Sequence, residues 1–281
     1  MERKVEKTVK GFRTRDGAGV SLVRVLGRDT VEDFDPILML DSFDSTNPED
    51  YIKGFPPHPH RGIETISYLR KGKMTHKDSL GNEDTISDGE VQWMTAGSGI
   101  IHSEALPESE MLLGVQLWLN LPKKDKMARP HYQAIRAEEI EEIEIDGGSI
   151  RLLAGTYKDH EGYMSAYLPL DYYDIGIDKG RKVTIESERD KSISIFTLLG
   201  SVEIGGTRLE EKTAAKLSLG DKTIIRAEED ARVLFISSDR LDEPVAWAGP
   251  IVMNTREELR QASLDLKDGS FVKDSIVFDD K

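Results

Sequence analysis

Short runs of β-branched, aromatic and aliphatic residues, separated by turns rich in Gly, Asp and Asn, make up most of the chain. Such runs occupy residues 65–69, 91–94, 113–119, 193–199, 223–226 and 233–237. Strands this short, joined by tight turns, are typical of a β-sandwich or β-barrel. One helix is predicted late in the chain, with Asn254 or Thr255 as its N-cap and Gly269 at its end. We therefore expect an all-β chain with a few short helices.

The composition changes once, near the middle of the chain. Residues 137–148 form an acidic stretch that ends in two glycines, which is typical of a solvated connector. We place a domain boundary here and predict an N-terminal domain over residues 1–136 and a C-terminal domain over residues 147–281. In each half, a β run ends in Gly, a second strand follows, and a turn containing Gly and Asp leads onward. This weak repeat predicts two copies of one β-barrel unit.

Composition and charge exclude several classes of protein. The 281 residues include no cysteine, which excludes a disulfide scaffold, a thiolate zinc site and a cysteine nucleophile. The net charge is −14, whereas direct binding to nucleic acid needs clustered Lys and Arg. The longest uncharged stretches, residues 91–103 and 111–122, fall short of the ~20 residues that span a bilayer. The first residues lack the apolar core of a signal peptide, so we expect a cytoplasmic protein that binds neither nucleic acid nor membrane.

Three histidines form the most informative cluster of candidate functional residues. His58, His60 and Glu64 are spaced by even numbers, so their side chains would share one side of an extended strand. His102 and Glu104 repeat this spacing later in the chain. Neighbouring strands of a barrel would then present three imidazoles and one or two carboxylates to a common point. Such a set suits Fe(II), Mn, Co, Ni, Cu or Zn, whereas an all-oxygen set would suit Mg or Ca.

These residues resemble the two motifs of the cupin superfamily and, more specifically, the signature of the pirin family. Residues 54–64, followed by Gly72, resemble the first cupin motif, and residues 89–102 resemble the second. The segments similar to pirin cover nearly the whole chain and include residues 58–69, 78–82, 91–104 and 249–259. The resemblance implies a bicupin, with two double-stranded β-helix (jelly-roll) barrels and one metal, usually iron, in the N-terminal barrel. The metal ligands that carry over from the family are His58, His60, His102 and Glu104.

The choice of carboxylate ligand separates the general cupin pattern from the pirin pattern. The general motif uses the glutamate of the first motif, here Glu64, whereas pirin uses the glutamate two residues after the last histidine, here Glu104. We assign Glu104 as the ligand, because it shares a strand with His102 and one backbone segment fixes both side chains. Glu64 is then expected either to contact one of the metal-binding side chains or to face outward.

The C-terminal half lacks a corresponding set of ligands. Aligning the two halves on Gly72 and Gly200 puts Glu186, Glu188 and Val233 at the positions of the three histidines. No histidine occurs in the chain beyond residue 160. We therefore expect a packed core in the second barrel, with its metal site lost.

Other polar and aromatic residues receive structural roles. His76 lies near a turn and is expected to face solvent, whereas Arg61 is expected to form a structural ion pair. His131 and His160 lie in polar, loop-like segments. Core packing is expected for four residues in apolar runs, of which the first two are also candidates for the mouth of the metal pocket: Trp93, Met94, Trp118 and Trp247.

The resemblance implies two classes of function. Pirin-like proteins are associated with quercetin 2,3-dioxygenase activity, in which a flavonol reacts with dioxygen, its ring opens and carbon monoxide leaves. An Fe(II) ion would act as a Lewis acid on the deprotonated 3-hydroxyl group, and Glu104 would be the catalytic base. The alternative is a non-enzymatic metal- or redox-sensing regulator, whose acidic charge favours a basic protein partner. A third reading is a bicupin that acts on another enol or diketone.

Overall fold

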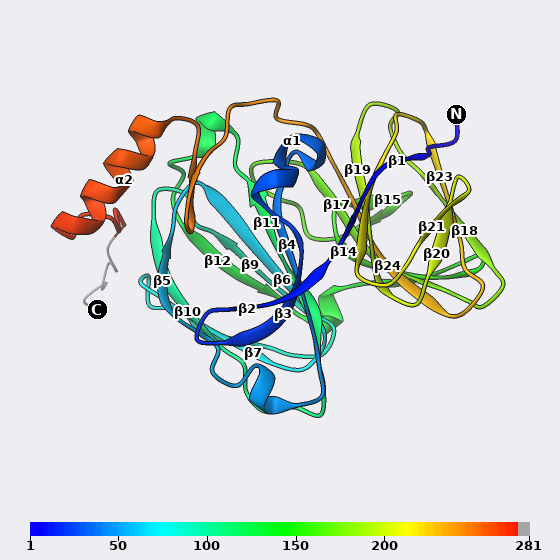
Figure 1. Ribbon diagram of the computed structural model, residues 1–281, viewed down its shortest axis with the longest axis horizontal. Coiled ribbons are helices and arrows are strands. Elements are labelled where there is room, and N and C mark those ends of the chain that lie inside the picture. The colour runs from blue at the N-terminus through cyan, green and yellow to red at the C-terminus, as the bar shows by residue number, and fades with distance from the viewer. Residues whose placement is uncertain (275–281) are drawn as a thin grey trace. The chain divides into compact units, whose positions relative to one another are not determined.

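The computed structural model describes residues 1–274, and strands make up most of it (Figure 1). The expected all-β class with a few short helices is confirmed. The chain forms two compact units. The N-terminal barrel contains residues 13–22, 43–137 and 242–274, and the C-terminal barrel contains residues 1–12, 23–42 and 138–241. The predicted boundary at residues 137–147 stays a prediction; in these units the first 12 residues group with the C-terminal barrel.

The N-terminal barrel is built on a seven-stranded sheet and a four-stranded sheet. The large sheet has the order β12 (His131–Ile135), β9 (Glu90–Thr95), β6 (Ile63–Lys71), β11 (Leu112–Asn120), β4 (Ile37–Ser45), β3 (Val20–Leu26) and β2 (Phe12–Asp16). The small sheet has the order β5 (Phe55–His60), β10 (Ile100–Ala105), β7 (Met74–Asp78) and β8 (Glu83–Ile86). Strands β25 (Ala246–Ala248) and β26 (Ile251–Met253) pair with each other. Residues of β3 and β4 are divided between the two units.

The C-terminal barrel repeats the pattern of seven and four strands. Its large sheet has the order β1 (Val5–Lys10), β22 (Thr213–Leu217), β19 (Ser192–Leu199), β24 (Ala231–Ser238), β17 (Leu170–Ile177), β14 (Gly148–Ala154) and β13 (Glu142–Ile145). Its small sheet has the order β18 (Lys182–Glu186), β23 (Lys222–Arg226), β20 (Val202–Ile204) and β21 (Thr207–Leu209). Strands β15 (Thr156–Tyr157) and β16 (His160–Glu161) form a separate pair. The repeat predicted from the sequence is therefore present in the fold.

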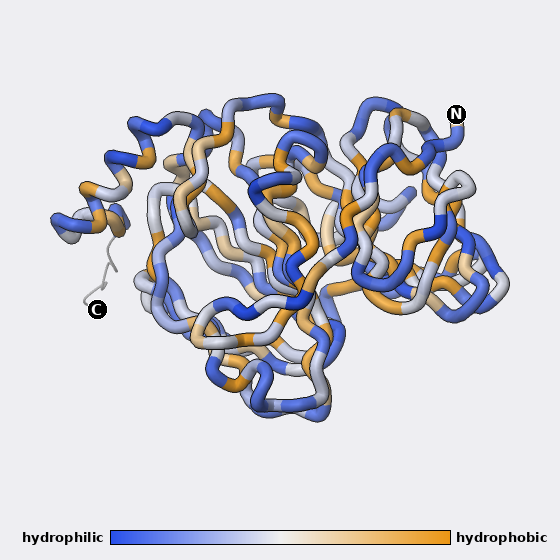
Figure 2. The backbone as a smooth tube through the Cα atoms, in the orientation of Figure 1, coloured by the Kyte–Doolittle hydropathy of each residue, from blue (hydrophilic) through white to orange (hydrophobic). Residues whose placement is uncertain are grey.

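Alternation of apolar and polar residues places the core of each barrel. In β18, Val183 and Ile185 are buried and their neighbours are exposed, because successive side chains of a strand point to opposite faces. Figure 2 shows this alternation as orange and blue segments along the strands. The central strands β11 and β19 are buried on both faces, with polar side chains among their apolar ones.

Helices are few and short, apart from one. They are η1 (Arg28–Thr30), α1 (Val31–Phe34), η2 (Pro48–Asp50), η3 (Lys123–Asp125), η4 (Ala137–Glu139) and α2 (Arg256–Asp268). The predicted late helix is confirmed as α2: the Thr255 hydroxyl accepts from the backbone N–H of Glu258 at 3.2 Å, and Gly269 ends the helix with a φ of 77°. Within the described residues, no helix is long and apolar enough to cross a bilayer.

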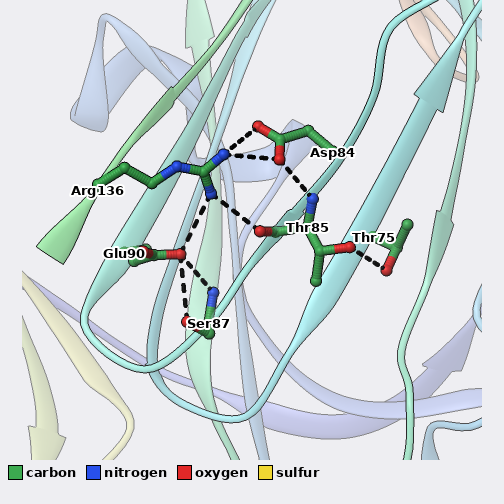
Figure 3. Close-up of polar contacts among 6 residues, drawn as sticks. All are labelled: Thr75, Asp84, Thr85, Ser87, Glu90 and Arg136. Atoms are coloured by element: carbon green, nitrogen blue, oxygen red, sulfur yellow. Dashed lines mark hydrogen bonds and ion pairs between the residues drawn. The ribbon is translucent and has the colours of Figure 1, made fainter.

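A charged cluster links Arg136, directly after β12, to strand β8 and to Glu90 at the start of β9 (Figure 3). The guanidinium group of Arg136 donates to both carboxylate oxygens of Asp84, each at 2.7 Å, and to the carbonyl oxygen of Thr85 at 2.9 Å. Glu90 accepts from the backbone N–H of Ser87 at 2.8 Å and also lies 3.4 Å from Arg136. These contacts link three strands of the N-terminal barrel, β8, β9 and β12.

Candidate metal centre

Two neighbouring strands of the small sheet carry the three histidines. His58 and His60 lie on β5, where their even spacing puts both side chains on one face. His102 lies on β10 and is the direct antiparallel partner of His58. The side chains of His60 and His102 are buried, whereas that of His58 is partly exposed.

The three imidazoles converge through the same ring atom. Nε2 of His58 lies 3.0 Å from Nε2 of His60 and 3.0 Å from Nε2 of His102. One ring nitrogen from each of the three histidines lies within 4.8 Å of the other two. Among the described residues, these three histidines form the group that could hold a metal ion. The structure therefore brings together three of the four residues expected to bind a metal.

Backbone carbonyl groups fix the tautomer of both histidines of β5, because each lies within hydrogen-bond distance of an Nδ1 atom. Nδ1 of His58 lies 2.8 Å from the carbonyl oxygen of Pro56, and Nδ1 of His60 lies 2.9 Å from that of Pro250. A carbonyl only accepts, so each Nδ1 carries the proton and each Nε2 keeps a lone pair. Burial, with a smaller effect from His58, lowers the pKa of His60 to about 3. Burial likewise holds the pKa of His102 well below its ordinary value, so both rings are neutral near pH 7.

These donors fit a divalent transition metal. In His58 and His60, lone pairs face each other at 3.0 Å with no proton between them, an arrangement that a cation would stabilise. Two Nε2 atoms bound at about 2.1 Å, a usual metal–imidazole distance, are about 3.0 Å apart when their bonds meet at a right angle. Imidazole nitrogen suits the series from iron to zinc.

Glu104 lies on the same strand as His102 but outside this group of three atoms. Its buried carboxylate accepts from the amide nitrogen of Gln92 at 2.6 Å and from that of Gln116 at 3.0 Å. The indole N–H of Trp118 donates to the amide oxygen of Gln116 at 3.4 Å, which orients that amide. The sequence pattern did not single out the two glutamines, which fix the carboxylate. The assignment of Glu104 as a ligand stays a prediction.

Glu64 does not join the histidines. Gly62, with a φ of +78°, separates β5 from β6, so the even spacing from His60 does not continue. The carboxylate of Glu64 accepts from the hydroxyl of Thr95 at 2.7 Å, and burial raises its pKa. On β6, Glu64 and Ser67 are an odd number of positions apart and lie on opposite faces. The hydroxyl group of Ser67, and not the carboxylate of Glu64, accepts from the side-chain amides of Gln92 and Gln116 that bind Glu104.

The C-terminal segment, residues 242–274, packs beside the histidines within the N-terminal barrel. The buried guanidinium group of Arg61 donates to Asp265 on α2 at 2.7 Å and to the carbonyl oxygen of Phe271 at 2.9 Å. The structural ion pair expected for Arg61 is thus confirmed. At Gly62 a Cβ atom would lie 2.0 Å from the carbonyl oxygen of Val252, so this close approach requires glycine.

The expectation that His76 faces solvent is wrong. Its side chain is fully buried on β7, and its ring stacks on Tyr132 at 4.2 Å between centroids. Nε2 of His76 lies 2.9 Å from Asp78, and Nδ1 lies 3.3 Å from Nδ1 of His102. Burial opposes ionisation of Asp78, but hydrogen bonds from His76 and Asn82 outweigh it and hold the pKa below its ordinary value. The local pattern does not reveal Tyr132, which comes from the other sheet.

Core packing is confirmed for Trp93, Met94 and Trp118, whereas Trp247 is only partly buried. Trp93 and Met94 are fully buried in the core. Trp118 lies edge-on to His60 at 4.9 Å between ring centroids, and Trp247 lies 5.9 Å from Trp118. Two further histidines lie away from the cluster: His131 is exposed, and His160 lies 2.9 Å from Glu141. His131 and His160 begin the short strands β12 and β16 and do not lie in loops.

The aligned positions of the C-terminal barrel carry no imidazole. Glu186 and Glu188 are exposed, and Val233 is fully buried in an apolar cluster. That cluster fills the unit with aliphatic and aromatic side chains. The loss of a metal site in this barrel stays a prediction.

Comparison with known protein families gives a match in each of the two barrels. A family model described as Pirin matches residues 19–119, and one described as Pirin C-terminal cupin domain matches residues 172–272. Pirin of Homo sapiens is 36% identical over 272 residues, which cover 94% of this chain and 92% of the relative. A pirin-like protein of Caulobacter vibrioides is 40% identical over 274 residues, 96% and 99% of the two chains.

Solved structures agree with the sequence comparisons. The crystal structure of a quercetin 2,3-dioxygenase from Acinetobacter baumannii matches with a TM-score of 0.90 at 35% identity. The match covers 96% of this chain and 99% of that one. The two barrels are therefore cupin domains, as expected, and the chain belongs to the pirin family.

Proposed function

We propose that this chain binds one divalent metal ion, Fe(II), and is a dioxygenase that opens flavonols of the quercetin type with release of carbon monoxide. The convergence of three Nε2 atoms on one point carries the proposal. The similar structure from Acinetobacter baumannii is that of a quercetin 2,3-dioxygenase, which supports the reaction class. The proposed ligands are His58, His60, His102 and Glu104. Mn, Co, Ni, Cu and Zn share the same preference for imidazole.

Glu104 is the proposed catalytic base. When bound, the metal would supply Lewis acidity that favours the ionised form of a substrate hydroxyl group. The carboxylate of Glu104 would accept the proton of the 3-hydroxyl group. Gln92 and Gln116 hold the carboxylate in place through their amide N–H groups.

Aromatic side chains beside the histidines support a planar aromatic substrate. The ring of Trp118 is 4.9 Å from that of His60, and Trp247 of the C-terminal segment lies next to it. Trp247 is partly exposed. Flat rings prefer offset stacking or edge contacts with such residues, which favours a flavonol over an aliphatic enol.

The test combines metal analysis with a turnover assay. The protein is purified without oxygen, loaded with Fe(II), and supplied with quercetin, other flavonols, and a panel of enols and diketones. We expect one metal per chain, consumption of flavonol and release of carbon monoxide in equal amounts. A fully loaded protein that turns over no flavonol would contradict the proposal. Turnover of a diketone alone would favour the third reading, and no turnover at all would favour the regulator.

A further inference from the structure

A chain of three buried side chains leads away from the metal centre through His102. Its Nε2 faces the other histidines, whereas its Nδ1 lies 3.3 Å from Nδ1 of His76. The opposite nitrogen of His76, Nε2, lies 2.9 Å from Oδ2 of Asp78. The side chains of His76 and Asp78 have no exposed surface. Neither residue has a role in the proposed reaction.

The direction of these hydrogen bonds follows from Asp78. Its carboxylate accepts from the backbone N–H groups of Leu80 and Asn82, at 2.9 and 3.1 Å, and from the amide nitrogen of Asn82 at 2.9 Å. An ionised carboxylate can only accept, so Nε2 of His76 carries the proton between them. A neutral imidazole then has a lone pair on Nδ1, which can only accept from His102.

The consequence falls on the ring of His102. With its proton on Nδ1, shared with His76, its lone pair lies on Nε2, where the rings of His58 and His60 converge. The opposite tautomer would put a proton on Nε2 and block metal binding. His58 and His60 use backbone carbonyls for the same purpose, whereas His102 depends on a side chain.

We propose that His76, held by Asp78, is the positioning residue that fixes the tautomer and orientation of His102 for metal binding. Stacking on Tyr132 at an interplanar angle of 12° keeps the ring of His76 in the required plane. A hydrogen bond from His102 to a ring that is itself bonded to a carboxylate also makes His102 a more basic ligand. The inference rests on the metal site of the proposed function but not on the substrate or the reaction.

The first experiment needs no metal. Long-range ¹H–¹⁵N spectra of the metal-free chain, with ¹⁵N-labelled histidine, distinguish protonated from unprotonated ring nitrogens. We expect the proton of His102 on Nδ1 in the wild type, and a mixture of tautomers in His76→Phe, which keeps the aromatic stack but removes the acceptor. A wild-type His102 protonated on Nε2 overturns the proposal, as does an unchanged tautomer in His76→Phe.

The second experiment measures the affinity for Co²⁺ by competition with a chelator, together with the absorption spectrum of the bound ion. His76→Phe should weaken binding about 10- to 100-fold and change the spectrum. His76→Asn, whose side-chain oxygen can replace Nδ1, should bind more tightly than His76→Gln, whose amide reaches toward Asp78 instead. His131→Asn, at an exposed histidine, is the matched control and should bind as the wild type does.

The outcomes separate the inference from the proposed function. Equal affinity of His76→Asn and His76→Gln, or wild-type affinity in His76→Phe, overturns the role of His76 and leaves the metal site intact. A wild type that binds no Co²⁺, Fe²⁺ or Ni²⁺ overturns both. If His76→Phe does not fold, the comparison of the two amide variants still decides.

Discussion

In each barrel, a row of paired residues crosses the second, third and fourth strands of the seven-stranded sheet. The two rows occupy equivalent positions but differ in chemistry. Across β9, β6 and β11 of the N-terminal barrel, the row of paired residues is Gln92, Ser67 and Gln116. Across β22, β19 and β24 of the C-terminal barrel, the row is Ala215, Ile195 and Phe235. The first row hydrogen-bonds to Glu104, whereas the second belongs to an apolar cluster.

The difference shows that the fold leaves the interior free to serve function or stability. Burying an amide or a carboxylate costs free energy unless each group finds a partner. In the N-terminal barrel these partners are Glu104 and the two glutamines themselves. In the C-terminal barrel, the ring of Phe235, which stacks on that of Tyr173 at 5.3 Å between centroids, contributes apolar burial without that cost.

The largest effect is expected at the histidine cluster. His102→Ala removes one of three converging imidazoles, so we expect metal content to fall from one equivalent per chain to nearly none. The apolar cores do not depend on the ion, and circular dichroism should show a folded protein. His131→Ala, which removes an exposed histidine, is the control and should keep one equivalent. Two tightly bound equivalents in the wild type would contradict the contrast between the barrels.

The two buried glutamates of the N-terminal barrel should differ in their effect on turnover. Glu104→Gln removes the proposed base and a charged ligand, and we expect a loss of about 100- to 10,000-fold in flavonol turnover. Glu64→Gln, on the other face of β6, should cost about 10- to 100-fold or less. Each variant is assayed for carbon monoxide release and metal content. An inactive Glu64→Gln beside an active Glu104→Gln would show that the general cupin pattern holds.

A substitution in the apolar row tests the other half of the comparison. Phe235→Ala leaves a cavity in the C-terminal barrel and should lower the free energy of unfolding by about 3–5 kcal/mol. Its metal content should match that of the wild type. Phe235→Leu is the matched control and should cost less, because it leaves a smaller cavity. Loss of metal in folded Phe235→Ala would show that the second barrel also supports the site.

The smallest effect is expected where α2 joins the N-terminal barrel. Hydrogen bonds from Gln261, Arg61 and Lys273 hold the pKa of Asp265 below its ordinary value. A carboxyl group with a lowered pKa stabilises the fold above its unfolded pKa of about 3.9, and this contribution is lost as the pH falls further. Asp265→Asn should therefore cost about 3 kcal/mol at pH 7, because Arg61 stays buried without its partner.

The measurement for Asp265→Asn is urea unfolding followed by tryptophan fluorescence. The three tryptophans of the chain, Trp93, Trp118 and Trp247, belong to the N-terminal barrel. The difference from the wild type should shrink between pH 4 and pH 3. A difference that stays constant over this range would contradict an ionised Asp265 as its source.

Local signals in the sequence were sufficient for much of this molecule. The capping residue Thr255 and the terminal Gly269 located α2, because both act within one turn of the helix. Even spacing placed His58 and His60 on one face, because strand alternation is a local property. The sheet pattern and the repeat followed from short apolar runs and turns.

Features that depend on distant residues were missed. The alternation does not extend from His60 to Glu64, because Gly62, with its positive φ, separates the two strands. Glu64 therefore does not share a face with the histidines. The burial of His76 depends on Tyr132 of another sheet, which its own neighbours in sequence do not reveal. The carbonyl of Pro250 near His60 has no local signal, because 190 positions separate the two residues.

That separation has a consequence for the order of events on the ribosome. At ~5–20 residues per second, about 10 to 40 seconds pass between the synthesis of His60 and that of Pro250. During this interval the Nδ1 atom of His60 lacks the carbonyl that orients its ring. An ion captured early meets a pair of imidazoles that can still rotate. Correct metal loading is therefore expected only after residues 242–274 have been synthesised and have docked, because the carbonyl of Pro250 then holds the ring of His60.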